Sequence, residues 1–276
     1  MKLTIRRLIV AAGLVTVGAG AGVNYAYSPE PETEKGLHLV LNIAGNRLHV
    51  YEDGERTRTY KVSVGARGYE TPAGDYTIRE VIWNPWWHPP NSAWARGRKP
   101  EAPGPENPMG RVKLNFAPLL YIHGTVDWQA LGQPASHGCV RMRNSDLIEL
   151  TRLVHSYASP RVGEDVLARL EGAPSMTRTI RLERSVKFTA RYDVAEVDEG
   201  FLIIYPDHYG LVRRQVRAQA IAALREVGAD VRRIDSARLD ELVEKSSDRR
   251  VVIALDELVS GRVVAGNNNE DSDTER

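Results

Sequence analysis

The chain contains one cysteine, Cys139, and its thiol is the residue best suited to covalent chemistry. A thiol that attacks an amide carbonyl needs a base to remove its proton and donors for the oxyanion that forms. His123 precedes the cysteine by sixteen residues and stands at the end of an apolar run. This pair predicts acyl transfer, with Cys139 as nucleophile and His123 as base.

The residues around Cys139 fit the same chemistry. The cysteine follows Gly138, which removes a side chain where a substrate carbonyl must approach the backbone. Backbone N–H groups of Gly138 and Cys139 are candidate oxyanion donors. A helix is predicted shortly afterwards, and the positive end of a helix dipole would lower the pKa of a nearby thiol.

Further polar groups surround the pair in sequence. The carbonyl of Gly124, directly after His123, is placed to orient the imidazole as the third member of a triad does. His137 is a second possible base, but neighbours in a turn often point apart, so shaping the turn or binding substrate is favoured. Arg141 and Arg143 either hold substrate carboxylates in bidentate fashion or remain solvated.

A lone cysteine or histidine is more often structural than catalytic, so the combined motifs carry the interpretation. The seven histidines show no HxxxH or CxxC spacing, and the sequence predicts no metal and no cofactor.

Taken together, the motifs resemble the L,D-transpeptidase family and its YkuD-type catalytic domain. The resemblance covers roughly residues 37–172. It rests on IHGT at 122–125, SHGCVRM at 136–142, TPAG at 71–74, NPMG at 107–110 and LHVYEDGE at 48–55.

The resemblance implies a mainly β catalytic domain, a sandwich-like fold with one or two short helices and the cysteine at an open cleft. It implies that Cys139 is the nucleophile, His123 the base and Gly124 the orienting carbonyl. The substrate-binding residues that we expect are Tyr121, Ser136, His137, Gly138, Arg141 and Arg143.

Such enzymes act on peptide stems of peptidoglycan. They attack the bond after the third residue of a tetrapeptide, release D-alanine and pass the acyl group to an amine on another stem or on an envelope lipoprotein. Water as acceptor would make the enzyme a hydrolase on the same scaffold. A non-catalytic wall-binding protein is the remote alternative, and the intact His123 and Cys139 pair argues against it.

The elements that must position these residues follow from the residue pattern. Alternating apolar residues over 37–43, around 48–50 and over 60–64, separated by Gly and Asn turns, predict an antiparallel unit. A strand is expected near 76–81 and another over 114–122. Residues 83–110 carry four of the five tryptophans and seven prolines, which indicates either a substrate-facing cap or a structural loop.

The second half of the chain changes composition after residue 172. A helix N-capped by Asn144 should bury Leu147, Leu150 and Val154 and end before Ser159, and residues 162–170 follow as a strand or short helix. Residues 173–265 predict a small α/β module. Its expected elements are strands at 179–188, 201–205, near 231 and at 251–255, and helices at 210–227 and 236–245. Residues 266–276 are expected to be a disordered tail.

The N-terminus indicates export. Residues 1–23 combine basic residues with an apolar run and predict a signal peptide or an N-terminal anchor, followed by a linker over 24–36. We therefore expect a periplasmic or cell-envelope protein that contacts the membrane only through an uncleaved N-terminal segment. The formal net charge of +1 gives no reason to expect a nucleic-acid partner, and a mean hydropathy of −0.37 excludes a polytopic membrane protein.

Overall fold

The computed structural model describes residues 27–29 and 35–259. The predicted signal or anchor segment, most of the predicted linker and the predicted tail lie outside these residues. Within the described part, no helix is long and apolar enough to cross a membrane.

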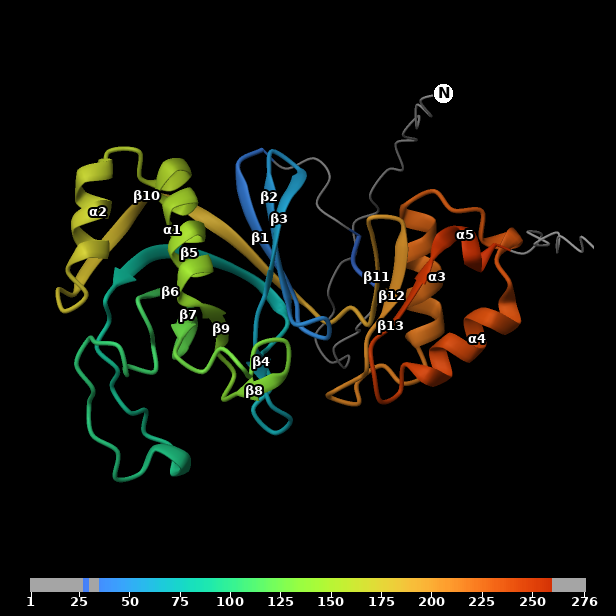
Figure 1. The fold of residues 1–276 in the computed structure, drawn as a ribbon, viewed down its shortest axis with the longest axis horizontal. Helices are drawn as coiled ribbons and strands as arrows, with labels where there is room; N and C mark the ends of the chain where they lie inside the picture. The colour runs from blue at the N-terminus through green and yellow to red at the C-terminus, as the bar shows by residue number, and fades with distance from the viewer. Residues whose placement is uncertain (1–26, 30–34, 260–276) are drawn as a thin grey trace, which may run out of the picture.

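The main structural unit is an eight-stranded sheet of mixed direction, with the order β3-β2-β1-β10-β5-β6-β7-β9 (Figure 1). Its strands are β1 (Leu37–Asn42), β2 (Arg47–Glu52), β3 (Glu55–Lys61), β5 (Gly74–Trp83), β6 (Val112–Ala117), β7 (Leu120–Thr125), β9 (Val140–Arg143) and β10 (Arg178–Arg191). Two short parallel strands, β4 (Val64–Gly65) and β8 (Pro134–Ser136), form a separate small sheet.

The first three strands form as the turn residues predict. Asn46 has φ 51° in the turn between β1 and β2, and Asp53 and Gly54 have φ 53° and 84° between β2 and β3. Asparagine, aspartate and glycine tolerate this left-handed region better than other residues, so these turns fix where each strand ends. The predicted antiparallel unit is confirmed.

The strand predicted over 114–122 is wrong. The segment forms two antiparallel strands, β6 and β7, which turn at Pro118 and Leu119. Leu119 takes φ 60°, which its side chain disfavours, and Pro118 cannot donate to a strand ladder. The apolar run hides the turn because no glycine or asparagine marks it.

Two helices follow β9. Helix α1 (Asn144–Ala158) buries Leu147, Leu150 and Val154 as predicted. Of the two structures expected for residues 162–170, the helix forms, as α2 (Glu164–Gly172). The predicted capping role of Asn144 is wrong. Asn144 is the first helical residue. Its side chain accepts from the N–H of Arg111 and donates to the carbonyl of Thr125, so it ties the residue before β6 and the end of β7 to α1.

Strand β10 corrects the predicted organisation of the second half. The sequence assigns this segment to the C-terminal module, whereas it pairs with β1 and β5 in the middle of the large sheet. Most side chains of its first half are exposed, so its pattern does not reveal a central strand. The predicted start of the module at residue 173 therefore does not coincide with the start of the second sheet.

After β10 the chain forms a three-stranded antiparallel sheet with helices on one side. The strands are β11 (Ala195–Asp198), β12 (Phe201–Ile204) and β13 (Val251–Ala254), and the helices are α3 (Val216–Glu226), α4 (Ser236–Lys245) and α5 (Leu255–Leu258). Helix α3 starts six residues later than predicted. The strand expected near 231 is instead a 3₁₀ turn, Val231–Arg233, because the side chain of Asp230 accepts from the N–H of Arg232.

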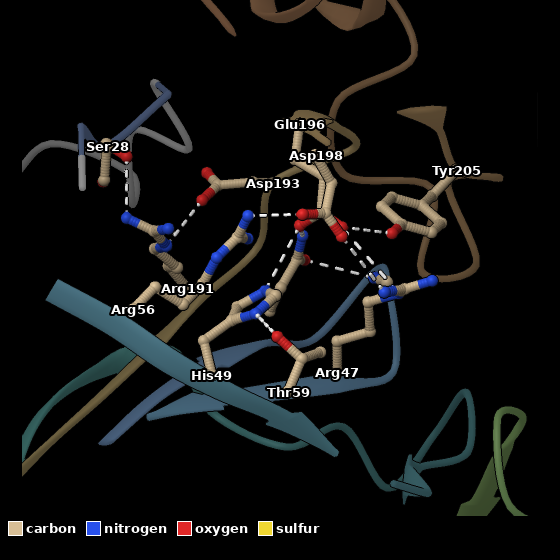
Figure 2. A network of polar contacts seen from close by, with 12 residues as sticks. Ser28, Arg47, His49, Arg56, Thr59, Arg191, Asp193, Glu196, Asp198 and Tyr205 are labelled. Carbon is tan, nitrogen blue, oxygen red and sulfur yellow. Dashed lines mark hydrogen bonds and ion pairs between the residues drawn. The ribbon is translucent and has the colours of Figure 1, made fainter. Parts of the chain in front are cut away.

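A buried polar network joins the second sheet to β1, β2 and β3 (Figure 2). Glu196 is 6% exposed, and its carboxylate lies 3.3 Å from His49 Nε2 and accepts from Asn42 and Tyr205. Burial opposes ionisation of Glu196, but these partners outweigh it and lower the pKa to about 2. The network fixes the C-terminal part against the sheet that carries the chemistry-bearing residues.

Candidate functional site

Two parallel strands bring the predicted pair to one face of the sheet. In the register of β7 and β9, Ile122 pairs with Val140 and His123 pairs with Arg141. Cys139 directly precedes β9 and therefore lies beside Tyr121. Because alternate residues of a strand share a face, Tyr121 and His123 point to the same side as Cys139 and Arg141.

A cavity of about 520 Å³ opens on this face. The sheet contributes Lys113, Tyr121, His123, Cys139 and Arg141 to its wall, and the long connection between β5 and β6 contributes Trp86, Trp87, Trp94, Arg98, Pro108 and Met109. The tryptophan-rich segment thus covers the cavity. Of its two interpretations, the substrate-facing cap fits this position.

His123 is held in one orientation. The residue is 5% exposed, and its Nδ1 lies 2.6 Å from the carbonyl oxygen of Gly124, to which it donates. Burial lowers the pKa of His123 to about 4, and the cations of Arg141 and Lys113 act in the same direction. At neutral pH the imidazole is uncharged, with Nε2 left as the basic nitrogen.

Cys139 is partly buried, and this burial disfavours its thiolate. Burial raises the pKa of the thiol, while the N–H of Tyr121 and the cations of Arg141 and Lys113 oppose that rise. Strand β9 separates the cysteine from α1. The predicted lowering of its pKa by a helix N-terminus is therefore wrong.

The turn before the cysteine is fixed by its own residues. Gly138 has φ 102°, a conformation that other residues adopt only with strain. Ser136 is 2% exposed; its hydroxyl donates to the carbonyl of Cys139 at 2.5 Å and accepts from the N–H of Gly138 at 3.1 Å. Neither Ser136 nor Gly138 is part of the cavity wall, and both shape the turn before Cys139. The N–H of Gly138 is already used, which leaves that of Cys139 as the better oxyanion candidate.

His137 lies at the mouth of the cavity. Its ring stacks on Trp94, with centroids 4.1 Å apart and planes 13° apart, and meets the edge of Tyr69 at 4.6 Å. Partial burial and nearby Arg141 and Arg98 lower its pKa. His137, within the turn before Cys139, thus holds the tryptophan-rich segment against the sheet.

The two arginines differ in position. Arg141 lines the cavity, whereas Arg143 does not and instead places its guanidinium 6.0 Å from the ring of Trp128. Arg141 is therefore the better candidate for a substrate carboxylate.

Lys113 is a cavity residue that the sequence did not predict. It pairs with His123 in the register of β6 and β7, and its Nζ lies 4.6 Å from the centroid of the Tyr121 ring. Burial lowers the pKa of Lys113. The alternation Val112, Lys113, Leu114 was a usable signal, but it needed the hairpin that the sequence did not reveal.

Among the described residues, no group of three or more His, Cys, Asp or Glu side chains is arranged to hold a metal ion.

Residues 36–172 match the family model of the YkuD L,D-transpeptidase catalytic domain. Through these residues the chain belongs to that family. The chain is 30% identical over 164 residues to the probable L,D-transpeptidase ErfK/SrfK of Escherichia coli K12. This alignment covers 56% of this chain and 47% of that protein. It is 35% identical over 118 residues to the probable L,D-transpeptidase YbiS of the same strain. This alignment covers 40% of this chain and 39% of that protein.

The chain thus spans about half or less of the length of these two curated relatives. Among solved structures, the catalytic domain of an E. faecium L,D-transpeptidase aligns over 56% of this chain and 98% of that chain, at 16% identity and a TM-score of 0.36. An overlap this low decides neither fold nor function.

Proposed function

We propose that this protein is a peptidoglycan L,D-transpeptidase that uses Cys139 as its nucleophile. The observation that carries the proposal is that His123 on β7 and Cys139, directly before the adjacent strand β9, line one cavity, with the imidazole oriented by the carbonyl of Gly124.

In the first half-reaction, His123 Nε2 takes the proton of the thiol as the sulfur attacks the carbonyl carbon after the third residue of a tetrapeptide stem. The negative charge that develops on the carbonyl oxygen is met by the N–H of Cys139. When the C–N bond breaks, His123 returns the proton to the departing nitrogen, and D-alanine leaves while the peptide remains as a thioester.

In the second half-reaction, an amine attacks the thioester and gives its proton to His123, and the thiol is released. A second stem supplies this amine in a 3→3 crosslink, and an envelope lipoprotein supplies it in protein attachment. The cations of Lys113 and Arg141 stand in the same cavity, where they suit the carboxylates of a stem peptide.

The remaining assignments complete the proposal. Residues 1–23 direct export as a signal peptide or anchor, so that the enzyme works in the periplasm or cell envelope. The α/β part after β10 is a small module joined to the catalytic sheet by the Glu196 network.

The test is incubation of the purified protein with peptidoglycan, followed by mass spectrometry of the released muropeptides. New 3→3 dimers are the expected result, and Cys139→Ala should produce none. Arg143→Ala serves as a matched control, because this arginine flanks the motif but lies outside the cavity. Shortened stems or freed protein without dimers would favour the hydrolase, and dimers formed by Cys139→Ala would refute the proposal.

A further inference from the structure

The segment after β12 reaches back to the catalytic sheet through one hydroxyl. Tyr209 is 7% exposed, and its hydroxyl donates to the carbonyl of Gly65 at 2.7 Å and accepts from the N–H of Thr71 at 3.2 Å. These two groups stand at the ends of the segment 65–71, which connects β4 to the approach of β5. Tyr209, from a distant part of the chain, thus holds both ends of the segment 65–71 together.

Thr71 carries the constraint to the nucleophile turn. Its hydroxyl accepts from the N–H of Gly65 at 2.8 Å and donates to the carbonyl of Gly138 at 2.9 Å, so the direction of its proton is fixed. The carbonyl of Gly138 and the N–H of Cys139 belong to one planar trans peptide, in which they point in opposite directions. Holding the carbonyl of Gly138 therefore aims the N–H of Cys139.

The peptide on the other side of the cysteine is held separately, since Ser136 donates to the carbonyl of Cys139. Both peptide planes that flank Cys139 are thus fixed by side-chain hydroxyls, from Thr71 and from Ser136. Of these two contacts, only the one made by Thr71 is linked to a residue outside the family-matched residues 36–172, namely Tyr209.

Tyr209 is itself anchored. Its N–H donates to the hydroxyl of Tyr192 at 2.9 Å, and the two rings stack with centroids 5.1 Å apart. The hydroxyl of Tyr192 donates to Asp207, whose carboxylate also accepts from the N–H groups of Leu211 and Val212. The tyrosine is therefore positioned by the end of β10 and by its own loop.

We propose that Tyr209 is a positioning residue for catalysis, which acts through Thr71 and Gly138 to aim the N–H of Cys139 at the developing oxyanion. Neither Tyr209 nor Thr71 lines the cavity, so neither contacts the bound substrate there. This inference rests on the proposed function, and it gives the part of the chain after β10 a role in the chemistry.

The decisive experiment compares two reactions of the same thiol. Acylation by a tetrapeptide stem or by a carbapenem forms an oxyanion, whereas alkylation by iodoacetamide is a direct displacement at carbon that forms none. Tyr209→Phe keeps the ring stacking and removes only the hydroxyl. We expect a fall of about tenfold or more in the acylation rate with KM little changed, and alkylation within about twofold of wild type.

The hydroxyl of Thr71 gives a second variant and a rescue. Thr71→Val should reproduce the selective loss of acylation, and Thr71→Ser, which keeps the hydroxyl, should retain activity. The double variant Tyr209→Phe/Thr71→Val should be no slower than Thr71→Val alone, because both act on one contact. Tyr205→Phe is the matched control, since it removes a buried hydroxyl that contacts Glu196 and leaves the segment 65–71 untouched.

Each other outcome has a distinct meaning. Equal loss of acylation and alkylation in Tyr209→Phe, with a matching fall in thermal midpoint, would reduce the residue to a structural role and overturn the inference. Unchanged acylation would overturn it as well. If the wild-type protein reacts with a carbapenem but not with any stem, the proposed function fails. The role of Tyr209 is then still tested by the rate of acylation by the carbapenem in wild type and in Tyr209→Phe.

Discussion

The resting state of the Cys139 and His123 pair can be tested by the pH dependence of thiol alkylation. Burial raises the pKa of Cys139 above its ordinary value of 9.0 and lowers that of His123 to about 4. Between pH 5 and 8 both groups are therefore neutral. The raised pKa of the thiol keeps Cys139 largely un-ionised at pH 7.

Iodoacetamide reacts with the thiolate, so its rate measures the ionised fraction. We expect the rate to rise about tenfold for each pH unit from 6 to 8, without a plateau in that range. The measurement follows the mass of the intact protein, and Cys139→Ser, which lacks the thiol, gives the background. A thiolate–imidazolium pair at rest would instead give a rate that is level across this range, and that result would refute the neutral pair.

Three further predictions concern the cap, the turn and the interface. Asn84 is 1% exposed and has φ 47°, and its Nδ2 donates to the carbonyls of Leu170, Ala173 and Met176. Because Asn84→Ala leaves these carbonyls without their donor, it should lower the free energy of unfolding in urea by roughly 2–4 kcal/mol. A change under about 0.5 kcal/mol would contradict this role. Gly138→Ala should abolish acylation while circular dichroism shows that the protein stays folded. The reason is that φ 102° strains any residue with a side chain, and a Cβ at this position would lie 3.2 Å from Leu120 Cδ2. Near-normal acylation by this variant would contradict the prediction. The folded pKa of Glu196, about 2, is below its ordinary value of 4.5, so its stabilising contribution is complete above pH 4.5 and is lost as the pH falls through about 2. The difference in unfolding free energy between wild type and Glu196→Gln should shrink over that range, and a difference that grows would show the opposite sign.

Local signals in the sequence sufficed where a single residue type controls the backbone. Asn46, Asp53 and Gly54 set the first two turns, and the spacing of Leu147, Leu150 and Val154 set the buried face of α1. The motif residues were found because their chemistry is rare and their spacing is short.

Non-local pairing was beyond reach. The exposed pattern of the first half of β10 gives no sign that it inserts between β1 and β5. The turn at Leu119 has no residue that favours its φ, so β6 and β7 appeared as one strand and Lys113 was missed. The role of Asn144 depends on the carbonyl of Thr125, which only the folded chain brings near it.

In the proposed reaction, the thiol of Cys139 carries the acyl group of a stem peptide. Mass spectrometry of the protein quenched in acid during turnover of a disaccharide-tetrapeptide tests it directly. We expect a mass increase equal to the mass of the substrate less that of D-alanine. The increase should map to the peptide that contains Cys139 and should be absent from Cys139→Ala. An adduct on another residue, or turnover by Cys139→Ala, would contradict it.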